Sequence, residues 1–304
     1  MFVRQVPFVY SSLGVTLKRL LKPRLSPIRK LMNQPSSLNN TKNNAVVAVN
    51  STVAADIDKQ LMSNKYGFTL PQLMELAGFS VSQVVYREYP LDNCGNNKVF
   101  IIVGSGNNGG DGLVCARHLK LFGYEPIVYY PTYTKSISKQ PFYNNLTLQL
   151  EEMFEIPIFK APIDKPSLTK YLAECRCVVD GVFGFSFKPP IRKDSVFFPI
   201  MEAMVEYSNA NGKGSGNVIS IDIPSGWDVD KGPLSLTNDD HAKYVQPKVL
   251  ISLTVPKLCT HFLDPTFTKH YVGGRFISGP FAESLGFKSF DYKGTDQILE
   301  LKMK

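Results

Sequence analysis

Residues 103–112 are Val103-Gly104-Ser105-Gly106-Asn107-Asn108-Gly109-Gly110-Asp111-Gly112. They follow an apolar run over 98–103 that predicts a strand, and they precede a segment over 113–122 that predicts a helix. Five of the nine residues from Gly104 to Gly112 are glycine, which permits positive φ angles and close approach to the main chain. We therefore expect a ligand to lie almost against the backbone at this strand-to-helix turn.

Short apolar runs alternate with helical segments along the rest of the chain. The predicted strands cover 98–103, 125–130, 175–179, 218–221 and 249–255, and the predicted helices cover 55–62, 113–122, 144–153 and 198–207. Strands joined by helices of this length indicate parallel crossovers. The chain is therefore predicted to be an α/β protein, a three-layer sandwich with helices on both faces of a mainly parallel sheet.

A further helix is predicted to begin after Thr69, because Thr69-x-x-Gln72 matches a capping box. Its apolar residues recur at helical spacing, at Leu70, Leu73, Met74, Ala77, Val81, Val84 and Val85. One face of this helix is therefore apolar. It must be covered either by the main body of the chain or by a second subunit.

The start of the chain carries the excess positive charge. Residues 1 to 55 contain eight Lys and Arg and no Asp or Glu. Subtracting those eight from the 34 Lys and Arg leaves 26, which equals the number of Asp and Glu. The remainder is formally neutral, so the net charge of +8 does not indicate binding to nucleic acid.

The basic, Ser-containing leader has leucines at broadly helical spacing, which is typical of a mitochondrial transit peptide. The Asn-rich part over 33–50 is predicted to be disordered. We therefore assign 1–54 to a targeting peptide and linker and 55–304 to one folded domain; an untargeted solvated tail is the alternative. Met32 and Met62 are possible internal starts that would yield a cytosolic form. No apolar run approaches the roughly 18 residues of a membrane span.

Polar motifs follow three of the predicted strands. They are Gly104 to Asp111 after the first strand, Asp180 to Lys188 after the third, and Asp222 to Trp227 after the fourth. In an open parallel sheet, ligands bind at the carboxyl ends of the strands. We therefore expect these motifs to meet in one crevice.

Gly104-x-Gly106-x-x-Gly109 after a strand also matches a dinucleotide-binding fingerprint, which by itself suggests a nicotinamide-dependent oxidoreductase. That site usually needs an acidic residue about 20 positions later to bind ribose, and Tyr129 and Tyr130 offer none. Asp111 would also place a carboxylate where a pyrophosphate would lie. The oxidoreductase therefore remains a less favoured alternative.

Asn108, Asp180 and Ser225 supply oxygen atoms from three strand ends, which suits a hard cation. The alternative for Asp180 and Asp222 is that each caps the turn or helix that follows it. Lys188 follows an aromatic loop and precedes Pro189-Pro190, so its ammonium is suited to phosphate contact or acid catalysis. A solvated surface lysine is its alternative.

Seven short motifs occur in order between residues 57 and 276. They are Ile57-Asp58-x-x-Leu61-Met62, Leu73-Met74-Glu75-Leu76-Ala77-Gly78, Gly106 to Gly112, Asp180-x-x-Phe183-Gly184-Phe185, Asp222-Ile223-Pro224-Ser225-Gly226, Val255-Pro256-Lys257 and Gly273-Gly274-Arg275-Phe276. Together they resemble the NAD(P)H-hydrate epimerases, the YjeF N-terminal domain family, from about residue 55 to the end of the chain.

The resemblance implies a Rossmann-like three-layer α/β/α sandwich, a homodimer, and epimerisation of the R and S forms of hydrated NADH and NADPH (NADHX and NADPHX). It assigns one K⁺ per subunit to Asn108, Asp180 and Ser225. It assigns the substrate to Asn107, Asn108, Gly109, Gly110, Asp111, Gly184, Phe185, Ser186, Phe187, Lys188, Pro189, Pro190 and Asp222. Many relatives have Gly after the loop lysine, so Pro189-Pro190 is a departure that restricts this loop.

The substrate implied by the resemblance carries a hydroxyl on the ring carbon next to nitrogen, so it is a hemiaminal. Its inversion requires either loss and re-addition of water or ring opening and reclosure. Both routes need one group to give a proton and another to take one. We expect Asp222 to be the principal acid/base catalyst and Lys188 to assist it or to bind phosphate.

A non-catalytic scaffold of the same fold is the other alternative. Loss of Asp222, Lys188 or the Asn107–Asp111 residues would mark it, and all are present. Some relatives carry a second domain, an ATP- or ADP-dependent NAD(P)H-hydrate dehydratase, for which this chain is too short. We therefore expect a separate polypeptide to supply that partner activity, and we expect no nucleic acid or membrane partner.

Overall fold

The computed structural model describes residues 47–91, 95–210, 216–234 and 244–302. The predicted transit peptide and residues 33–46 of the predicted linker lie outside the described residues, as does Met32. Within the predicted linker, Val49 pairs with Lys257, and helix α2 (Ser51–Leu61) begins ahead of the helix start predicted at residue 55. No helix in the described ranges is both long enough and apolar enough to cross a membrane.

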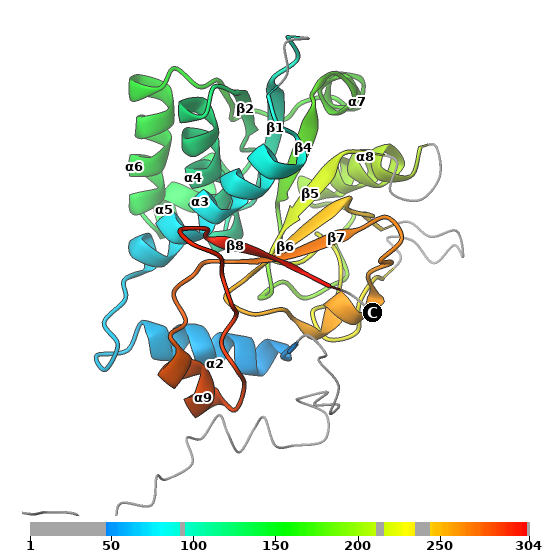
Figure 1. Ribbon diagram of the computed structural model, residues 1–304. Helices are drawn as coiled ribbons and strands as arrows, with labels where there is room; N and C mark the ends of the chain where they lie inside the picture. Colours follow the sequence, from blue (N-terminus) through cyan, green and yellow to red (C-terminus); the bar gives the residue numbers. More distant parts are fainter. Residues whose placement is uncertain (1–46, 92–94, 211–215, 235–243, 303–304) are drawn as a thin grey trace, which may run out of the picture.

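One eight-stranded sheet forms the centre of the molecule (Figure 1), in the order β3-β2-β1-β4-β5-β6-β7-β8. Neighbouring strands are parallel except for β7 and β8, which are antiparallel. The strands are β1 (Lys98–Val103), β2 (Glu125–Tyr129), β3 (Ile158–Phe159), β4 (Cys177–Gly181), β5 (Val218–Ile221), β6 (Val249–Leu253), β7 (Lys269–Gly273) and β8 (Ile298–Leu301). The predicted α/β architecture with a mainly parallel sheet is confirmed.

Helices cover both faces of the sheet, which makes the three predicted layers (Figure 1). They are α2 (Ser51–Leu61), α3 (Leu70–Glu88), α4 (Asn107–Leu121), α5 (Tyr133–Lys139), α6 (Phe142–Leu148), α7 (Lys165–Glu174), α8 (Phe197–Asn209) and α9 (Gly279–Leu285). A π-helical turn over Gln149–Met153 follows α6, and a 3₁₀ turn covers Leu258–Phe262.

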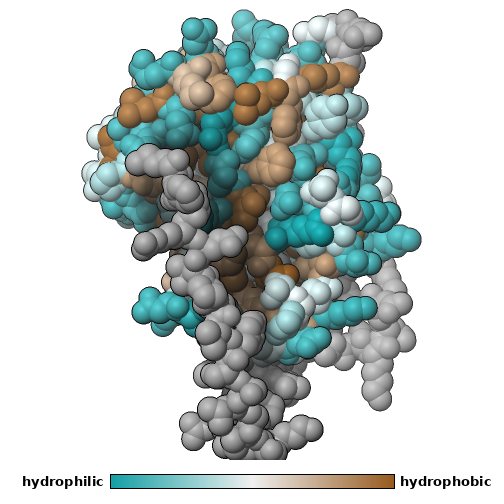
Figure 2. Space-filling model, turned by 60° about the vertical axis from the view of Figure 1, so that its left-hand side comes forward, coloured by the Kyte–Doolittle hydropathy of each residue, from teal (hydrophilic) through white to brown (hydrophobic). Residues whose placement is uncertain are grey.

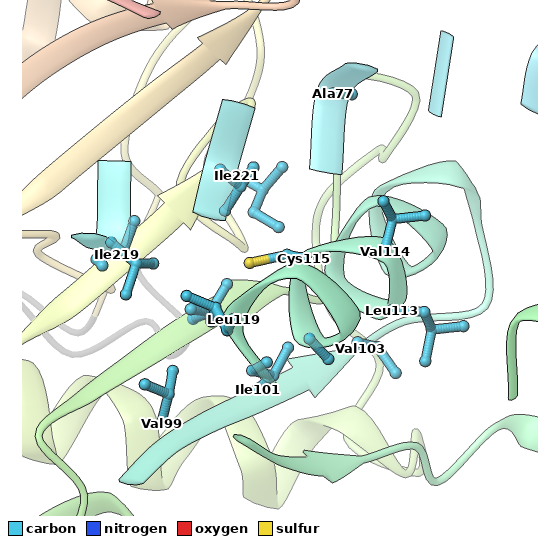
Figure 3. Close-up of a cluster of buried hydrophobic side chains, with 14 of the residues drawn as sticks. Ala77, Val99, Ile101, Val103, Leu113, Val114, Cys115, Leu119, Ile219 and Ile221 are labelled. Atoms are coloured by element: carbon cyan, nitrogen blue, oxygen red, sulfur yellow. The ribbon is translucent and has the colours of Figure 1, made fainter. Parts of the chain in front are cut away.

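The two faces of the sheet bury alternate residues of the same strands. In β1, Val99, Ile101 and Val103 face α3, α4 and α6, whereas Phe100 and Ile102 face α7 and α8. Figure 3 shows the first of these cores, where side chains of α4 meet those of the sheet. Because the strands are buried on both faces, their sequences are nearly continuous apolar runs.

The capping box of α3 forms as predicted: the Thr69 hydroxyl accepts from the Gln72 N–H, and the Gln72 side chain accepts from the Thr69 N–H. The apolar stripe of α3 packs against α4 and the sheet of the same chain. The stripe is therefore a core face.

Several predicted boundaries were wrong. Helix α4 begins at Asn107 rather than at 113, because six of the residues that look like a loop form its first turns. Strand β4 ends at Gly181, so Asp180 lies within the strand and not after it. Strands β3, β7 and β8 and helices α5, α7 and α9 were not predicted, because their runs are short or polar.

Helices α2 and α9 lie side by side below the sheet (Figure 1). They share a third core, in which Val53, Ile57 and Leu61 of α2 meet Phe281 and Leu285 of α9. This pair places α2 next to the carboxyl ends of the central strands.

Candidate active site

A cavity of about 510 Å³ lies at the carboxyl ends of β1, β4, β5 and β6. This is the place where strand order reverses in the sheet, since β1 has both β2 and β4 as neighbours. Figure 2 shows a hollow lined by hydrophobic residues on one face of a largely hydrophilic surface. The polar and charged side chains of the cavity are Asp58, Ser105, Asn107, Asn108, Asp111, Ser186, Asp222, Thr254 and Lys257.

The glycines of the 104–112 segment have a different role from the one predicted. None of them has a positive φ angle. Instead they allow protein atoms to touch: a Cβ on Gly104 would lie 1.9 Å from the Val182 carbonyl oxygen, and one on Gly109 would lie 2.1 Å from the Gly104 carbonyl oxygen. The glycines therefore let this segment pack directly against neighbouring backbone atoms, which fixes the start of α4.

The side chains of this segment diverge. Asn107 is exposed, and its side-chain amide oxygen accepts a hydrogen bond of 2.9 Å from the Tyr143 hydroxyl. Asn108 is buried and donates through its amide to the Phe183 carbonyl at 3.1 Å. Asp111 is also buried and lines the cavity, and no hydrogen bond to its carboxyl group is found among the described residues.

Asn108, Asp180 and Ser225, the predicted cation ligands, come together around Phe183. The Phe183 carbonyl accepts from Asn108, and the Phe183 N–H donates to the Ser225 hydroxyl at 2.9 Å. The Ser225 hydroxyl in turn donates to the Asp180 carboxylate. The Phe183 backbone therefore links the start of α4, strand β4 and the loop after β5.

The Asp180 carboxylate is fully buried and saturated with hydrogen bonds. Its oxygens accept from the hydroxyls of Ser225 and Ser220, the Ser225 N–H and the Val182 N–H. Burial raises the pKa of Asp180, and these hydrogen bonds oppose that rise. The carboxylate ties β4 to the loop after β5, and its bond from the Val182 N–H also caps the turn that follows it, as the capping alternative predicted.

Asp222 forms an ion pair with Lys257 at the floor of the cavity. The two residues are 4% and 2% exposed, so the pair is almost completely shielded from water. The Lys257 ammonium also donates to the Leu253 carbonyl at 2.8 Å, and Asp222 accepts from the N–H groups of Phe185 and Leu253. The φ angle of Asp222 is 69°, a conformation that is uncommon outside glycine and that is found in turns and at active sites.

Two further carboxyl groups face the same cavity. Burial raises the pKa of Asp58 to about 6; the Lys257 ammonium opposes this rise and the Asp222 carboxylate adds to it. Burial also raises the pKa of Asp111 well above its usual value, with smaller contributions from Asp222 and Asp58. Among the described residues, the cavity is therefore lined by three carboxyl groups and one ammonium group.

The predicted substrate loop divides at residue 187. Gly184, Phe185, Ser186 and Phe187 line the cavity, and the Lys257 ammonium lies 5.4 Å from the Phe185 ring centroid. Lys188 and Pro190 are exposed, and the residues from Lys188 to Pro190 are not among those that line the cavity. The roles predicted for Lys188, Pro189 and Pro190 stay predictions.

Sequence reasoning assigned no role to Lys257 or Asp58, although both stand in motifs that carried the family resemblance. Lys257 follows β6, next to the strand that ends before Asp222, so the strand-end rule would have found it. Asp58 lies on α2, outside the sheet. No spacing in the sequence points from that helix to the cavity.

The chain matches the family described as YjeF-related protein N-terminus over residues 70–259. It is 48% identical to the NAD(P)H-hydrate epimerase of Saccharomyces cerevisiae over 83% of this chain and 98% of that protein. The enzyme of the same name from Schizosaccharomyces pombe is 40% identical over 86% of this chain and 98% of its own length. The crystal structure of yeast ynu0 is similar, with a TM-score of 0.73 and 49% identity, over 84% of this chain and 99% of that one.

Proposed function

Because this chain belongs to the YjeF N-terminal domain family, we propose that it is an isomerase that epimerises the R and S forms of hydrated NADH and NADPH. The observation that carries the proposal is the buried ion pair of Asp222 and Lys257 beneath a cavity with two more carboxyl groups. Groups that can give and take protons around one substrate are what this epimerisation needs.

The residues of the cavity suit the chemistry of a hemiaminal. Asp222, which is held by an ammonium group and two N–H groups, is oriented to take a proton from a hydroxyl group or a water molecule. The apolar and aromatic residues around it, such as Met74 and Phe185, exclude bulk water and offer surfaces for a nicotinamide ring. Net oxidation or reduction is not involved, so the nicotinamide is the substrate and not the cofactor.

The two alternative functions receive no support. A redox enzyme that binds a dinucleotide would have an acidic residue at the end of the second strand, and β2 ends at Tyr129. A non-catalytic scaffold would not need a strained, ion-paired Asp222 below an open cavity. The relatives described above carry the name of epimerases.

A coupled assay tests the proposed function directly. The purified chain is added to the epimer that an epimer-specific dehydratase rejects, together with that dehydratase and its nucleotide. Recovery of NADH at a rate that depends on the concentration of the chain is expected. Recovery no faster than spontaneous epimerisation would rule the function out.

One K⁺ per subunit at Asn108, Asp180 and Ser225 is part of the proposal. The donor chemistry suits a weakly charged hard cation, because an amide, a carboxylate, a hydroxyl group and the Phe183 carbonyl gather in one hydrogen-bonded cluster. The Ser225 hydroxyl would have to turn its hydrogen away from Asp180, which a hydroxyl can do. A bound K⁺ would supply positive charge that offsets Asp180 and fixes the loops around the cavity.

The remaining proposals concern location and assembly. The basic leader supports targeting to mitochondria, and the family resemblance supports a homodimer and a functional link to a separate dehydratase. A fluorescent protein fused to residues 1–50 is expected in mitochondria, whereas diffuse cytosolic fluorescence would contradict the targeting. Sedimentation equilibrium of the full chain tests the dimer.

A further inference from the structure

Asp58 is a carboxyl group of the cavity to which the family resemblance assigned no role. It projects from α2 into the space that Asp222 and Lys257 also line. No hydrogen bond or ion pair to its side chain is found within the described part of the chain. Its carboxyl group is therefore available to a bound molecule.

The position of Asp58 is fixed by several contacts of α2. The Asn50 side chain caps the helix by accepting from the Val53 N–H at 2.9 Å. The N–H and hydroxyl of Ser51 both donate to Asp230, each at 2.8 Å. The apolar stripe of α2 next to Asp58 is buried against α9. Asp58 is consequently held at the rim of the cavity by a packed helix and not by a loop.

The charges around Asp58 favour different protonation states for the three carboxyl groups of the cavity. Lys257 is paired with Asp222, so Asp222 carries the compensated negative charge. Asp58, from α2, and Asp111, from α4, face the same pair without a cation of their own. Since like charges in one cavity oppose ionisation, a proton is retained on these two groups more readily than on an exposed carboxyl.

Of these two groups, Asp58 is the better proton donor to a substrate. Burial places the pKa of Asp58 near 6, close to the pH at which an enzyme works, so it can release and recover a proton. Asp111 is 7% exposed, and burial raises its pKa well above the usual value, which favours a neutral hydrogen-bond donor. The two carboxyl groups therefore suit different tasks.

We propose that Asp58 is a catalytic residue, the acid that protonates the departing hydroxyl of the hydrated nicotinamide while Asp222 acts as the base and Lys257 positions Asp222. This inference rests on the proposed function. It makes helix α2, which lies outside the sheet, a functional part of the active site.

The Asp58 proton moves to the hydroxyl, the carbon–oxygen bond breaks with its electron pair leaving on water, and the ring nitrogen lone pair forms a C=N⁺ bond. Water then adds to the opposite face of that carbon, the C=N⁺ electron pair returns to nitrogen, and the released proton goes to Asp222. Transfer of this proton from Asp222 to Asp58 through water restores the enzyme.

The test compares Asp58→Asn with Asp56→Asn in the full chain, by using the coupled assay. Asp56 lies on the same helix and is not among the residues that line the cavity, so it controls for altered charge on α2. We expect kcat of Asp58→Asn to fall by about 100-fold or more, which is the usual contribution of a general acid, and that of Asp56→Asn to stay within about twofold.

The pH profile separates catalysis from a structural effect. In the wild type, kcat/KM is expected to fall as the pH rises through the pKa of Asp58, and Asp58→Asn should lose this limb. Asp58→Glu, which keeps an acid, should retain the limb at reduced kcat. Tm at pH 8 should not fall in Asp58→Asn, because a partly buried carboxylate is removed.

Two results would overturn the inference: a kcat of Asp58→Asn within threefold of the wild type, or a slow variant that keeps the wild-type pH limb. If Asp58→Asn fails to fold, Asp58→Glu takes its place in the test. A folded Asp58→Glu whose kcat/KM does not fall at high pH would then overturn the inference. An inactive wild type would instead contradict the proposed function, so the two failures are distinguishable.

Discussion

Val49 pairs with Lys257 in an isolated parallel bridge. The Val49 N–H donates to the Pro256 carbonyl at 2.9 Å, and the Val49 carbonyl accepts from the Leu258 N–H at 3.0 Å. Both peptide groups that flank Lys257 are thereby fixed by the segment just before α2. The ammonium that holds Asp222 therefore depends on residues that precede α2.

This bridge predicts different activity and stability for chains that begin at the two possible internal starts. A chain that begins at Met32 keeps Val49, Asn50 and all of α2, and we expect it to be as active and as stable as the full chain. A chain that begins at Met62 lacks the bridge and Asp58, and we expect it to lose epimerase activity and stability. Purified chains of both lengths are compared by the coupled assay and by Tm; an active chain from Met62 would contradict this prediction.

Lys257→Met is expected to destabilise the protein by about 3–5 kcal/mol, because it leaves the buried Asp222 carboxylate without its cation. The double variant with Asp222→Asn should recover much of this loss while staying inactive, which urea unfolding and the coupled assay measure. Lys188→Met is the matched control at an exposed lysine and should leave the free energy of unfolding unchanged within about 0.5 kcal/mol. If the losses measured for Lys257→Met alone and Asp222→Asn alone simply add in the double variant, the two residues are not a coupled pair.

KCl is expected to raise Tm and epimerase activity relative to choline chloride at equal ionic strength, since a ligand that binds the folded state stabilises it. Ser225→Ala, which removes a proposed ligand, should abolish this response. Ser220→Ala is the control, because Ser220 also donates to Asp180, at 2.8 Å, but is not a proposed ligand. An identical potassium response in all three proteins would show that the ion does not bind at this cluster.

Gly104→Ala is expected to destabilise the fold by about 1–3 kcal/mol or more, because the added methyl would overlap the Val182 carbonyl oxygen at 1.9 Å. Gly106→Ala adds a methyl group with no atom within 4 Å and should cost less than about 1 kcal/mol. Urea unfolding gives both values. Similar costs at the two positions would mean that the segment can shift to relieve the overlap.

Asp58 should make stability depend on pH. Its pKa is higher in the folded protein, about 6, than in the unfolded chain, so its contribution is fully present below pH about 4 and is lost as the pH rises through about 6. The free energy of unfolding of Asp58→Asn, taken relative to that of the wild type, should therefore be higher at pH 8 than at pH 4. Urea unfolding at both pH values measures this difference, with Asp56→Asn as control; a difference that does not change with pH would contradict the raised pKa.

The fold could be predicted to a large extent from the sequence. Continuous apolar runs such as 98–103 are typical of strands buried on both faces, and Thr69 with Gln72 marks a helix start by local hydrogen bonding alone. The short edge strand β3 and the antiparallel β8 were missed, because two to four residues carry too little periodicity to be recognised.

The convergence of Asn108, Asp180 and Ser225 was also predictable, since the carboxyl ends of parallel strands meet at one edge of a sheet. The role of the glycines was not. Whether a glycine serves a ligand or its own backbone depends on what packs against it, and only the position of Val182 beside Gly104 decides that.

The sequence by itself determined the architecture and the residue types at the strand ends, because periodicity and strand-end motifs are local properties of the chain. The tertiary structure alone decided that Lys257 neutralises Asp222 and that Asp58 faces both across a cavity. The physical reason is that ion pairing and burial depend on distances between segments far apart in the chain. Those distances are set by how α2 packs on α9 and by how Val49, just before α2, pairs with Lys257 after β6.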